Sequence, residues 1–389
     1  MFYDIVRFDD LTERDLASWF RLRDMFQGYN SPFFSPEFTH TMSRVRDDIW
    51  VILHGRGDEV EVVWPIQKYG RTAEPVGAPF SDYHGPIMHP EWDGDFQELL
   101  AHVGLNCMRM TGVYEPQGRL QKYAAEFDGA YITDLREGAD AFFEEQRKRY
   151  PKHAKKMRRL SRKVEREVGE LVFRFDDRDS DTFDELMELK EAQYAQTGRH
   201  NVLGPDWVKE MLFRLWAADD KDCQGYLHTL KSDGKLIAAE FNLTCRETIH
   251  GWIPAYNPEF AAYAPGMLLQ DAILPEAAAR GFVHYDLGVS AGHYKKYYMS
   301  YQIQVMRGTI WSRSLRSGLN ASGERLWLGL ESAGIPKLSG VAGQIRRRYD
   351  VIRSVETSFS DRMKGVATAA KLALKPADVA HASAGNDDD

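Results

Sequence analysis

The chain has 389 residues, of which 43% are hydrophobic and 28% are charged, and its formal net charge is −8. Because single cores rarely grow beyond roughly 250–300 residues, this length predicts two folded units. The net negative charge argues against general DNA binding. No apolar run approaches the roughly 18 residues of a membrane-spanning helix.

The cysteines indicate a reducing compartment. Only Cys107, Cys223 and Cys245 occur, and they are too widely separated to predict a disulfide framework or a cysteine-rich zinc site. The first residues contain acids where a secretory signal needs an apolar core. We therefore expect a cytoplasmic protein, and no HExxH or clustered His/Cys pattern indicates a metal.

The N-terminal third predicts an α/β unit. A helical pattern covers residues 11–25, and β-like runs cover residues 49–55 and 60–70. Arg56, Gly57 and Asp58 lie between these runs and suit a hairpin turn, so the two strands should be antiparallel. A further strand near residues 130–135 should close this half.

A Pro/Gly-rich loop, EPVGAPFSDYHGPIMHP, contains the densest polar group of this half, formed by Asp82, Tyr83 and His84. Its glycine and proline neighbours permit the sharp backbone of a binding loop, so we expect these three side chains to face the acceptor substrate. Although Ser81 precedes them, near-adjacent side chains cannot easily converge as a hydrolase triad.

A basic helical stretch follows over residues 139–168. Eleven lysines and arginines lie between Arg147 and Arg166, and Pro151 should begin or kink a helix there. Such a helix can be a solvated surface, or it can bind a nucleic acid, an anionic membrane or a phosphorylated ligand. The sequence leaves these alternatives open.

The second half predicts helices followed by antiparallel strands, an order that differs from the one-for-one alternation of a doubly wound sheet. Asp233 and Gly234 suit the tight turn of a hairpin, and Gly281 should end a helix. No GxGxxG or GxxxxGK[ST] motif occurs, which excludes the common nucleotide-binding classes. The expected elements are strand 171–175, helices 181–196 and 206–218, hairpin 225–245, strand 247–254, helix 267–280 and strand 282–288.

Four runs of this half, IAAEFNL, AYNPEF, YAPGMLLQDAI and HYDLGVSAGHYKKYY, resemble the GNAT-like acyltransferases of cellulose and exopolysaccharide biosynthesis. SPFFSPEF and PVGAPFSDYHGPI are similar to the preceding half of the same group. The resemblance implies an α+β fold of two tandem GNAT-like mixed sheets flanked by helices, distantly similar to transferases that add amino acids to peptidoglycan precursors. We divide the chain into residues 1–140, residues 141–312 with the basic helix, and a helical basic extension with a polar tail over residues 313–389.

The resemblance also implies a thioester donor, acetyl-coenzyme A, whose pyrophosphate meets a helix N-terminus. Unpaired amides and the helix dipole attract anions there. Ala264, Pro265, Gly266 and Met267 form the candidate, because Pro suits a first helical position and Gly permits close approach. The Tyr-Lys pair of the family falls on Lys295, which we expect to neutralise a phosphate or carboxylate.

Acyl transfer needs a group that accepts a proton from the nucleophile, and often an acid for the leaving thiolate. Glu240 follows two alanines in an apolar strand, where a carboxylate is either paired or functional. His250 is an alternative base or a packed strand histidine, and Tyr294 could donate a proton. Asp286 lies at a strand end, where it either holds the following loop or orients and deprotonates the acceptor, as the resemblance implies.

Beyond residue 312 we expect a basic helix that either is solvated or grips an anion through Arg346, Arg347, Arg348 and Arg353. The anion could be a regulator such as a cyclic dinucleotide or the inner membrane surface. The sequence thus predicts an acyltransferase that moves acetyl from acetyl-coenzyme A to the nitrogen or oxygen of a small or lipid-linked sugar or envelope precursor. Aminoacyl transfer from charged tRNA, and a degenerate GNAT pair that binds an anion, are the alternatives.

Overall fold

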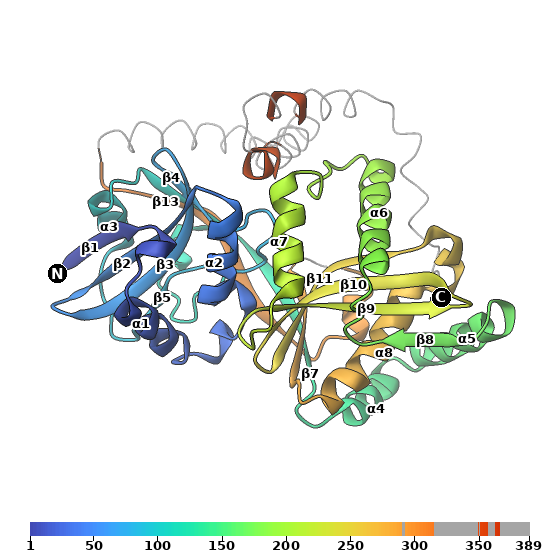
Figure 1. Ribbon diagram of the computed structural model, residues 1–389. Helices are drawn as coiled ribbons and strands as arrows, with labels where there is room; N and C mark the ends of the chain where they lie inside the picture. Colours follow the sequence, from blue (N-terminus) through green and yellow to red (C-terminus); the bar gives the residue numbers. More distant parts are fainter. Residues whose placement is uncertain (290–291, 315–348, 350, 357–361, 366–389) are drawn as a thin grey trace, which may run out of the picture.

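The computed structural model describes residues 1–289, 292–314, 349, 351–356 and 362–365. The first half begins with a strand and two helices, and an antiparallel pair of strands, two short strands, a helix and a strand follow (Figure 1). These elements are β1 (Phe2–Val6), α1 (Glu13–Arg23), α2 (Pro36–Val45), β2 (Ile49–Arg56), β3 (Glu59–Tyr69), β4 (Thr72–Glu74), β5 (Ile87–Met88), α3 (Phe96–His102) and β6 (Cys107–Val113).

One long strand and two helices connect the halves, and the second half then repeats the strand, helix, helix, strand order of the first. The remaining elements are β7 (Ala124–Asp134), α4 (Ala139–Arg149), α5 (Pro151–Glu167), β8 (Leu171–Arg174), α6 (Ser180–Thr197), α7 (Asp206–Ala217), β9 (Gln224–Ser232), β10 (Lys235–Cys245), β11 (Thr248–Tyr256), α8 (Pro265–Ala279), β12 (His284–Val289) and β13 (Tyr301–Trp311). Two short 3₁₀ helices, η5 (Pro258–Tyr263) and η6 (Lys295–Tyr297), flank α8 and β12.

The two halves have the same internal strand order. In the first half the neighbours run β1, β2, β3, β4, β6, and in the second they run β8, β9, β10, β11, β12. In each half the last of these pairings is parallel, between β4 and β6 or between β11 and β12, whereas the other pairings are antiparallel. The predicted fold of tandem mixed sheets flanked by helices is confirmed.

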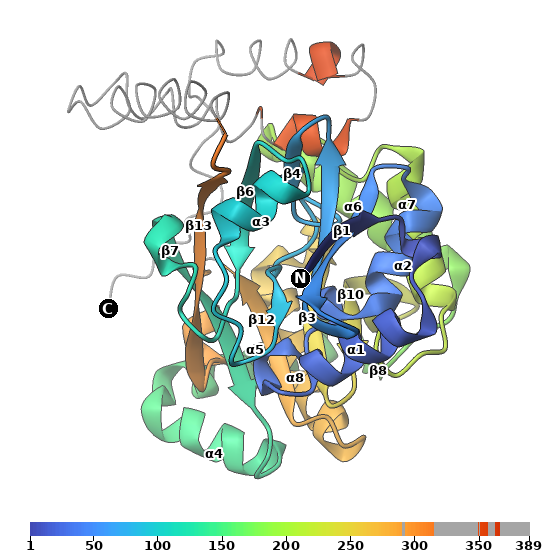
Figure 2. The same cartoon turned by 90° about the vertical axis from the view of Figure 1, so that its left-hand side faces the viewer.

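The halves exchange strands where they meet. β13, from the end of the second half, pairs with β6 and β7, while β7 pairs with β12. The order β6, β13, β7, β12 therefore joins both halves into one continuous 13-stranded sheet. Figure 2 shows β13 and β7 side by side along this junction.

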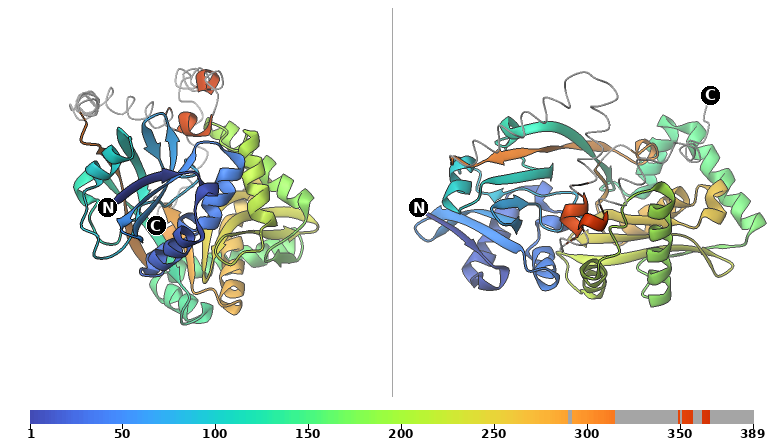
Figure 3. Two further views of the ribbon diagram at one scale, coloured as in Figure 1. Left: turned by 60° about the vertical axis from the view of Figure 1, so that its left-hand side comes forward. Right: turned by 90° about the horizontal axis from the view of Figure 1, so that it is seen from above.

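Helices cover both faces of the sheet, and one buried cluster crosses the junction. It joins Trp19 and Phe38 of the first half to Leu212 and Phe241 of the second. α2 and α7 pack against each other at this point, as Figures 1 and 3 show. α8 covers the other face of the second half through residues such as Leu269. The shared core gives the halves a fixed relative position, which the site described below requires.

Several local predictions are confirmed. α5 begins at Pro151, and the β9–β10 turn places Asp233 and Gly234 at φ angles of 49° and 72°. α8 begins at Pro265 after Ala264, which caps it in the left-handed conformation, and the helix continues through Pro275. Within the part of the chain that the structure describes, no helix is both long enough and apolar enough to cross a membrane.

Candidate active site

The edge between β11 and β12 opens into a fork. The two strands pair in parallel at three positions only, and the last of these joins His250 to Asp286. Beyond it, β11 continues to Tyr256 beside β10, whereas β12 continues to Val289 beside β7. Because neither strand pairs with the other past this point, the backbone groups that face the fork need partners from outside the sheet.

A buried cluster occupies the fork and draws on both halves. His250 donates through Nε2 to Oδ2 of Asp82, 3.0 Å away. Its Nδ1 lies 3.3 Å from Oδ2 of Asp286, an ion-pair distance without hydrogen-bond geometry. Tyr83 donates its hydroxyl to Oδ1 of Asp286 at 2.9 Å, and the amide of Gly288 donates to the same oxygen at 2.8 Å. The structure thus brings together four residues that the sequence singled out separately.

The charge of His250 is fixed by its two carboxylate neighbours. Burial would lower the pKa of His250, but the nearby carboxylates of Asp286 and Asp82 outweigh burial and raise the pKa to about 9. The imidazole is therefore protonated at neutral pH, so it holds the carboxylates together and cannot accept a proton. The sequence left His250 open as an alternative base or a packed strand histidine, and its contacts favour the packed role.

Glu240 is the group with the properties of a base. Glu240 lies on β10 and is buried. Its Oε1 is close to Gly251, since a Cβ at position 251 would lie 2.8 Å from this oxygen. Any residue other than glycine at position 251 would therefore crowd the carboxyl. Burial raises the pKa of Glu240 to about 7, although a hydrogen bond from Tyr285 and the charge of Lys190 oppose the increase. A carboxyl that titrates near neutral pH is well suited to accept and release a proton.

Tyr294 and Lys295 follow the fork on the η6 segment. Burial and the charge of Glu240 raise the pKa of Tyr294, so its phenol stays protonated and can donate. Lys295 is buried, and its Nζ donates to the carbonyl oxygens of Gly288 and Val289 at 3.2 and 3.0 Å. Its ammonium therefore holds the end of β12, and the expected contact with a phosphate or carboxylate stays a prediction.

Sequence reasoning missed Lys190, Tyr285 and Asn242. Lys190 of α6 donates to the carbonyl oxygen of Pro254 at 2.7 Å, and burial lowers its pKa to about 8. Asn242 donates to the Tyr285 hydroxyl at 3.1 Å, while that hydroxyl also bonds Glu240. A signal for Asn242 was its alternation with Glu240 in one strand, whereas nothing local links Lys190 to this site.

The first turn of α8 lies close to the η6 segment, because the hydroxyl of Tyr298 donates to the carbonyl oxygen of Met267 at 3.1 Å. The amides of Met267 and Leu268 bond to the carbonyl oxygen of Ala264. Since Pro265 has no N–H, Gly266 supplies the one amide of this turn that is not bonded within the described residues. Gly266 is exposed, and no atom lies within 4 Å of the position of a Cβ there.

Two predicted site residues lie elsewhere. His84 is buried in the first half, where its Nε2 accepts from the amide of Thr111 at 3.3 Å, and burial lowers its pKa to about 3. It is thus a neutral structural side chain, unlike its neighbours Asp82 and Tyr83. Arg353 forms an ion pair with Glu74, so its guanidinium is used within the protein. Arg346, Arg347 and Arg348 lie outside the described residues.

Glu37, Asp220 and Asp222 bring carboxylate oxygens within 4.8 Å of one another, as a cation site would. Asp222, however, already pairs with Arg23 at 2.9 Å and with Arg246 at 2.7 Å. These guanidinium groups supply the positive charge, so the cluster fits a structural role.

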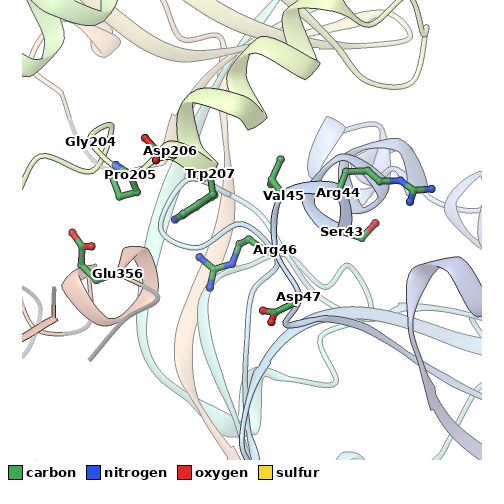
Figure 4. Close-up of a pocket in the computed structure, with 10 residues that line it drawn as sticks. All are labelled: Ser43, Arg44, Val45, Arg46, Asp47, Gly204, Pro205, Asp206, Trp207 and Glu356. Atoms are coloured by element: carbon green, nitrogen blue, oxygen red, sulfur yellow. The ribbon is translucent and has the colours of Figure 1, made fainter. Parts of the chain in front are cut away.

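A groove lies between α2, α7 and residues 351–356, where Arg46 extends below Trp207 (Figure 4). The Arg46 guanidinium lies 4.6 Å from the Trp207 ring centre and donates to the carbonyl oxygen of Ser354. The Trp207 indole donates to the carbonyl oxygen of Val355 at 2.9 Å. These contacts fasten the C-terminal segment across both halves, and none of the predicted site residues lines this groove.

Residues 151–296 match the family model of the acetyltransferase (GNAT) domain. Distant likeness extends to FemX, with 12% identity over 70% of this chain and 90% of that chain and a TM-score of 0.45. A tandem GNAT protein of clavulanic acid biosynthesis shares 12% identity over 80% of this chain and 98% of that chain, also with a TM-score of 0.45. A GCN5-related N-acetyltransferase from Kribbella flavida is 13% identical over 80% and 71% of the two chains, with a TM-score of 0.38.

The matched segment covers α5, the fork and most of the η6 segment. It defines the class of the protein, an acyltransferase with a GNAT domain. No curated protein sequence matches the chain.

Proposed function

We propose that this protein transfers an acetyl group from acetyl-coenzyme A to an amine or hydroxyl of a small or lipid-linked sugar or other cell-envelope precursor. The observation that carries the proposal is the position of Glu240 at the fork, as a buried carboxyl with a pKa of about 7. A GNAT domain supplies the reaction class. The class of acceptor rests on the resemblance of the four sequence runs to exopolysaccharide acyltransferases.

In the proposed reaction the acceptor nitrogen or oxygen attacks the thioester carbonyl, and the carbon–sulfur bond breaks. Glu240 accepts the proton of the nucleophile, and the neutral Tyr294 phenol donates one to the leaving thiolate. The cluster of Asp82, His250 and Asp286 positions the two halves around the fork. Thiol release from acetyl-coenzyme A in the presence of amino sugars and neutral sugars measures this activity.

Gly266 provides a test of the donor site. Because no atom lies within 4 Å of the position of a Cβ, Gly266→Val fits the protein and would obstruct only a ligand. We expect this change to raise the calorimetric Kd for acetyl-coenzyme A at least about tenfold, a loss of roughly 1.4 kcal/mol. Gly266→Ala is the smaller control and should change Kd less. A wild-type protein that does not bind acetyl-coenzyme A would remove it as the donor.

Aminoacyl transfer from charged tRNA is the second candidate. The observation in its favour is the single unbonded amide in the first turn of α8, since a pyrophosphate is usually held by several amides. Calorimetry with charged tRNA separates the candidates. Tight binding of charged tRNA without binding of coenzyme A would place aminoacyl transfer first.

A further inference from the structure

α5 is the most strongly charged surface of the described chain, and acetyl transfer gives its charge no role. Met157, Leu160 and Val164 are buried and pack the helix against the second half, where α5 contacts α4, η5 and α8. The opposite side is exposed and basic over the full 17 residues, a length of about 25 Å at 1.5 Å per residue. Its exposed bases are Lys152, Lys155, Arg158, Arg159, Arg162 and Arg166.

Most of this charge is not neutralised by the protein. No ion pair links Lys152, Lys155, Arg159 or Arg162 to an acid among the described residues. The pairs that do form near it use Lys163 and Arg166 with Glu167 at the end of the helix. Between Arg147 and Arg166 the sequence has one acid against eleven bases, while the whole chain carries −8. This stretch therefore carries a local excess of positive charge in a chain whose net charge is negative.

α5 also runs along the border of the fork. At its start His153 stacks on Tyr297 of η6, with ring centres 3.8 Å apart. At its end Glu167 accepts from the hydroxyl of Tyr263, the last residue of η5 before the start of α8. The two segments that flank the proposed donor and acceptor sites thus contact opposite ends of this helix. α4 and α5 lie at the outer end of the second half in Figures 1 and 3.

We propose that the exposed face of α5 adsorbs the protein to an anionic phospholipid membrane. Its exposed bases recur every three or four residues, so they lie on one side of a single 17-residue helix, an arrangement that suits a flat charged surface. Because charges interact over a Debye length of about 8 Å at physiological salt, a membrane would attract this face without contacting the acidic remainder.

A nucleic acid is less well matched. Single-stranded nucleic acids are held by aromatic rings set among bases, and the aromatic residue of α5, His153, is already stacked on Tyr297. The apolar stripe of α5 is buried in the protein, so adsorption depends on charge and not on insertion. Adsorption would hold the fork beside lipid-linked acceptors, a consequence that rests on the proposed function, whereas adsorption itself does not.

The test is flotation of the full chain with vesicles of phosphatidylcholine alone and of an equal mixture of phosphatidylcholine and phosphatidylglycerol. We expect binding to the mixed vesicles only, and release as salt is added. Each base near an anionic surface contributes about 1 kcal/mol, or roughly fivefold. Combining Lys152→Gln, Lys155→Gln, Arg159→Gln and Arg162→Gln should therefore lower the partition coefficient by at least about 100-fold.

A matched control removes the same charge elsewhere, through Lys122→Gln, Lys209→Gln, Lys221→Gln and Lys235→Gln, all at exposed positions. It should retain binding within about threefold. Equal loss in both variants, or no binding of the wild-type protein to anionic vesicles, would overturn the proposal. Binding of tRNA through the α5 bases without vesicle binding would also overturn it, in favour of a nucleic-acid surface. The assay requires no acyl donor, so its outcome is independent of the proposed activity.

Discussion

Asp286 and Glu240 are both buried carboxylates near the fork, but their partners give them different chemistry. Both oxygens of Asp286 are occupied, one by Tyr83 and Gly288 and the other by the charged His250. Glu240 instead has a pKa near 7 and a neighbouring neutral phenol, Tyr294. We therefore propose proton transfer for Glu240 and positioning for Asp286, of the roles that the sequence left open.

Glu240→Gln should keep the fold, because an uncharged amide resembles a carboxyl that is already half protonated near neutral pH. Single-turnover transfer should fall about 10²–10⁴-fold, the usual contribution of a general base. In the wild-type protein the rate should rise with pH through about 7 and then level, since only the carboxylate accepts a proton. A variant with wild-type rates would exclude Glu240 as the base.

Asp286→Asn should act mainly on stability. It leaves the charged His250 with one carboxylate, and breaking a buried ion pair costs about 3–5 kcal/mol. We expect a lowered midpoint of urea unfolding, with turnover of the remaining folded protein within about tenfold of wild type. A stable variant with a 10²–10⁴-fold lower kcat would instead make Asp286 a catalytic base.

His250 should make the stability depend on alkaline pH. Its folded pKa of about 9 exceeds the ordinary histidine pKa of 6.5, so the contribution to stability is complete below about pH 6.5 and is lost as pH rises through 9. The free energy of unfolding should fall by at most about 3 kcal/mol across this interval. In Asp82→Asn the folded pKa of His250 should be lower. The decrease in the free energy of unfolding should then be smaller and should end at lower pH. Denaturant titrations of both proteins at several pH values measure it.

Sequence named Asp82, Tyr83, His250 and Asp286 because each is a polar residue in a loop or strand that suits a site. It could not show that they meet, since Asp82 comes from the first half and the other half supplies His250. The hydrogen-bond partners of His84 and Lys295 were not predictable either. They are backbone groups from other segments, which only tertiary packing brings close. Lys190 was missed for the same reason.

At the scale of elements, the candidate site forms where β11 and β12 stop pairing. The sequence pattern predicted both strands, but it did not predict that they pair in parallel. The hairpin of β9 and β10 and the start of α8 were predictable from local turn and cap residues. β13 was not predicted, although it lies within residues 141–312, because the expected elements ended with the strand at residues 282–288. Pairings between distant strands have no local signal.

Gly251→Ala tests whether the fork needs close approach between β11 and Glu240. The new Cβ would lie 2.8 Å from Oε1 of Glu240 and 3.0 Å from the hydroxyl of Tyr285, so one of them must move. We expect a fall in kcat of at least about tenfold and a displaced apparent pKa in the pH–rate profile. Gly129→Ala is the matched strand control, because its Cβ meets only ordinary contacts of 3.6 Å or more. Equal effects of both changes would contradict the explanation.

At the scale of the whole molecule, the exchange of β7 and β13 makes each half depend on the other. A chain that ends at residue 300 lacks β13, which leaves facing edges of β6 and β7 unpaired. We expect that chain to aggregate, because unpaired edges recruit other strands. A chain that ends at residue 314 keeps the sheet, loses the contacts of residues 351–356, and should keep the oligomeric state of the full chain with a lower Tm. Size-exclusion chromatography and circular dichroism of both chains test this, and a monomeric, folded shorter chain would contradict it.

The same exchange of strands also affects folding during synthesis, because β13 is translated long after β6. Met306 of β13 pairs with Val113 of β6, and at about 5–20 residues per second a separation of roughly 200 residues delays that pairing by about 10–40 s. During this interval the first half can bury its helices, but its last strand waits for a partner still to be translated. A nascent chain in this state is a substrate for chaperones, so translation speed between β6 and β13 should govern the yield of native protein more than the stability of the finished sheet does.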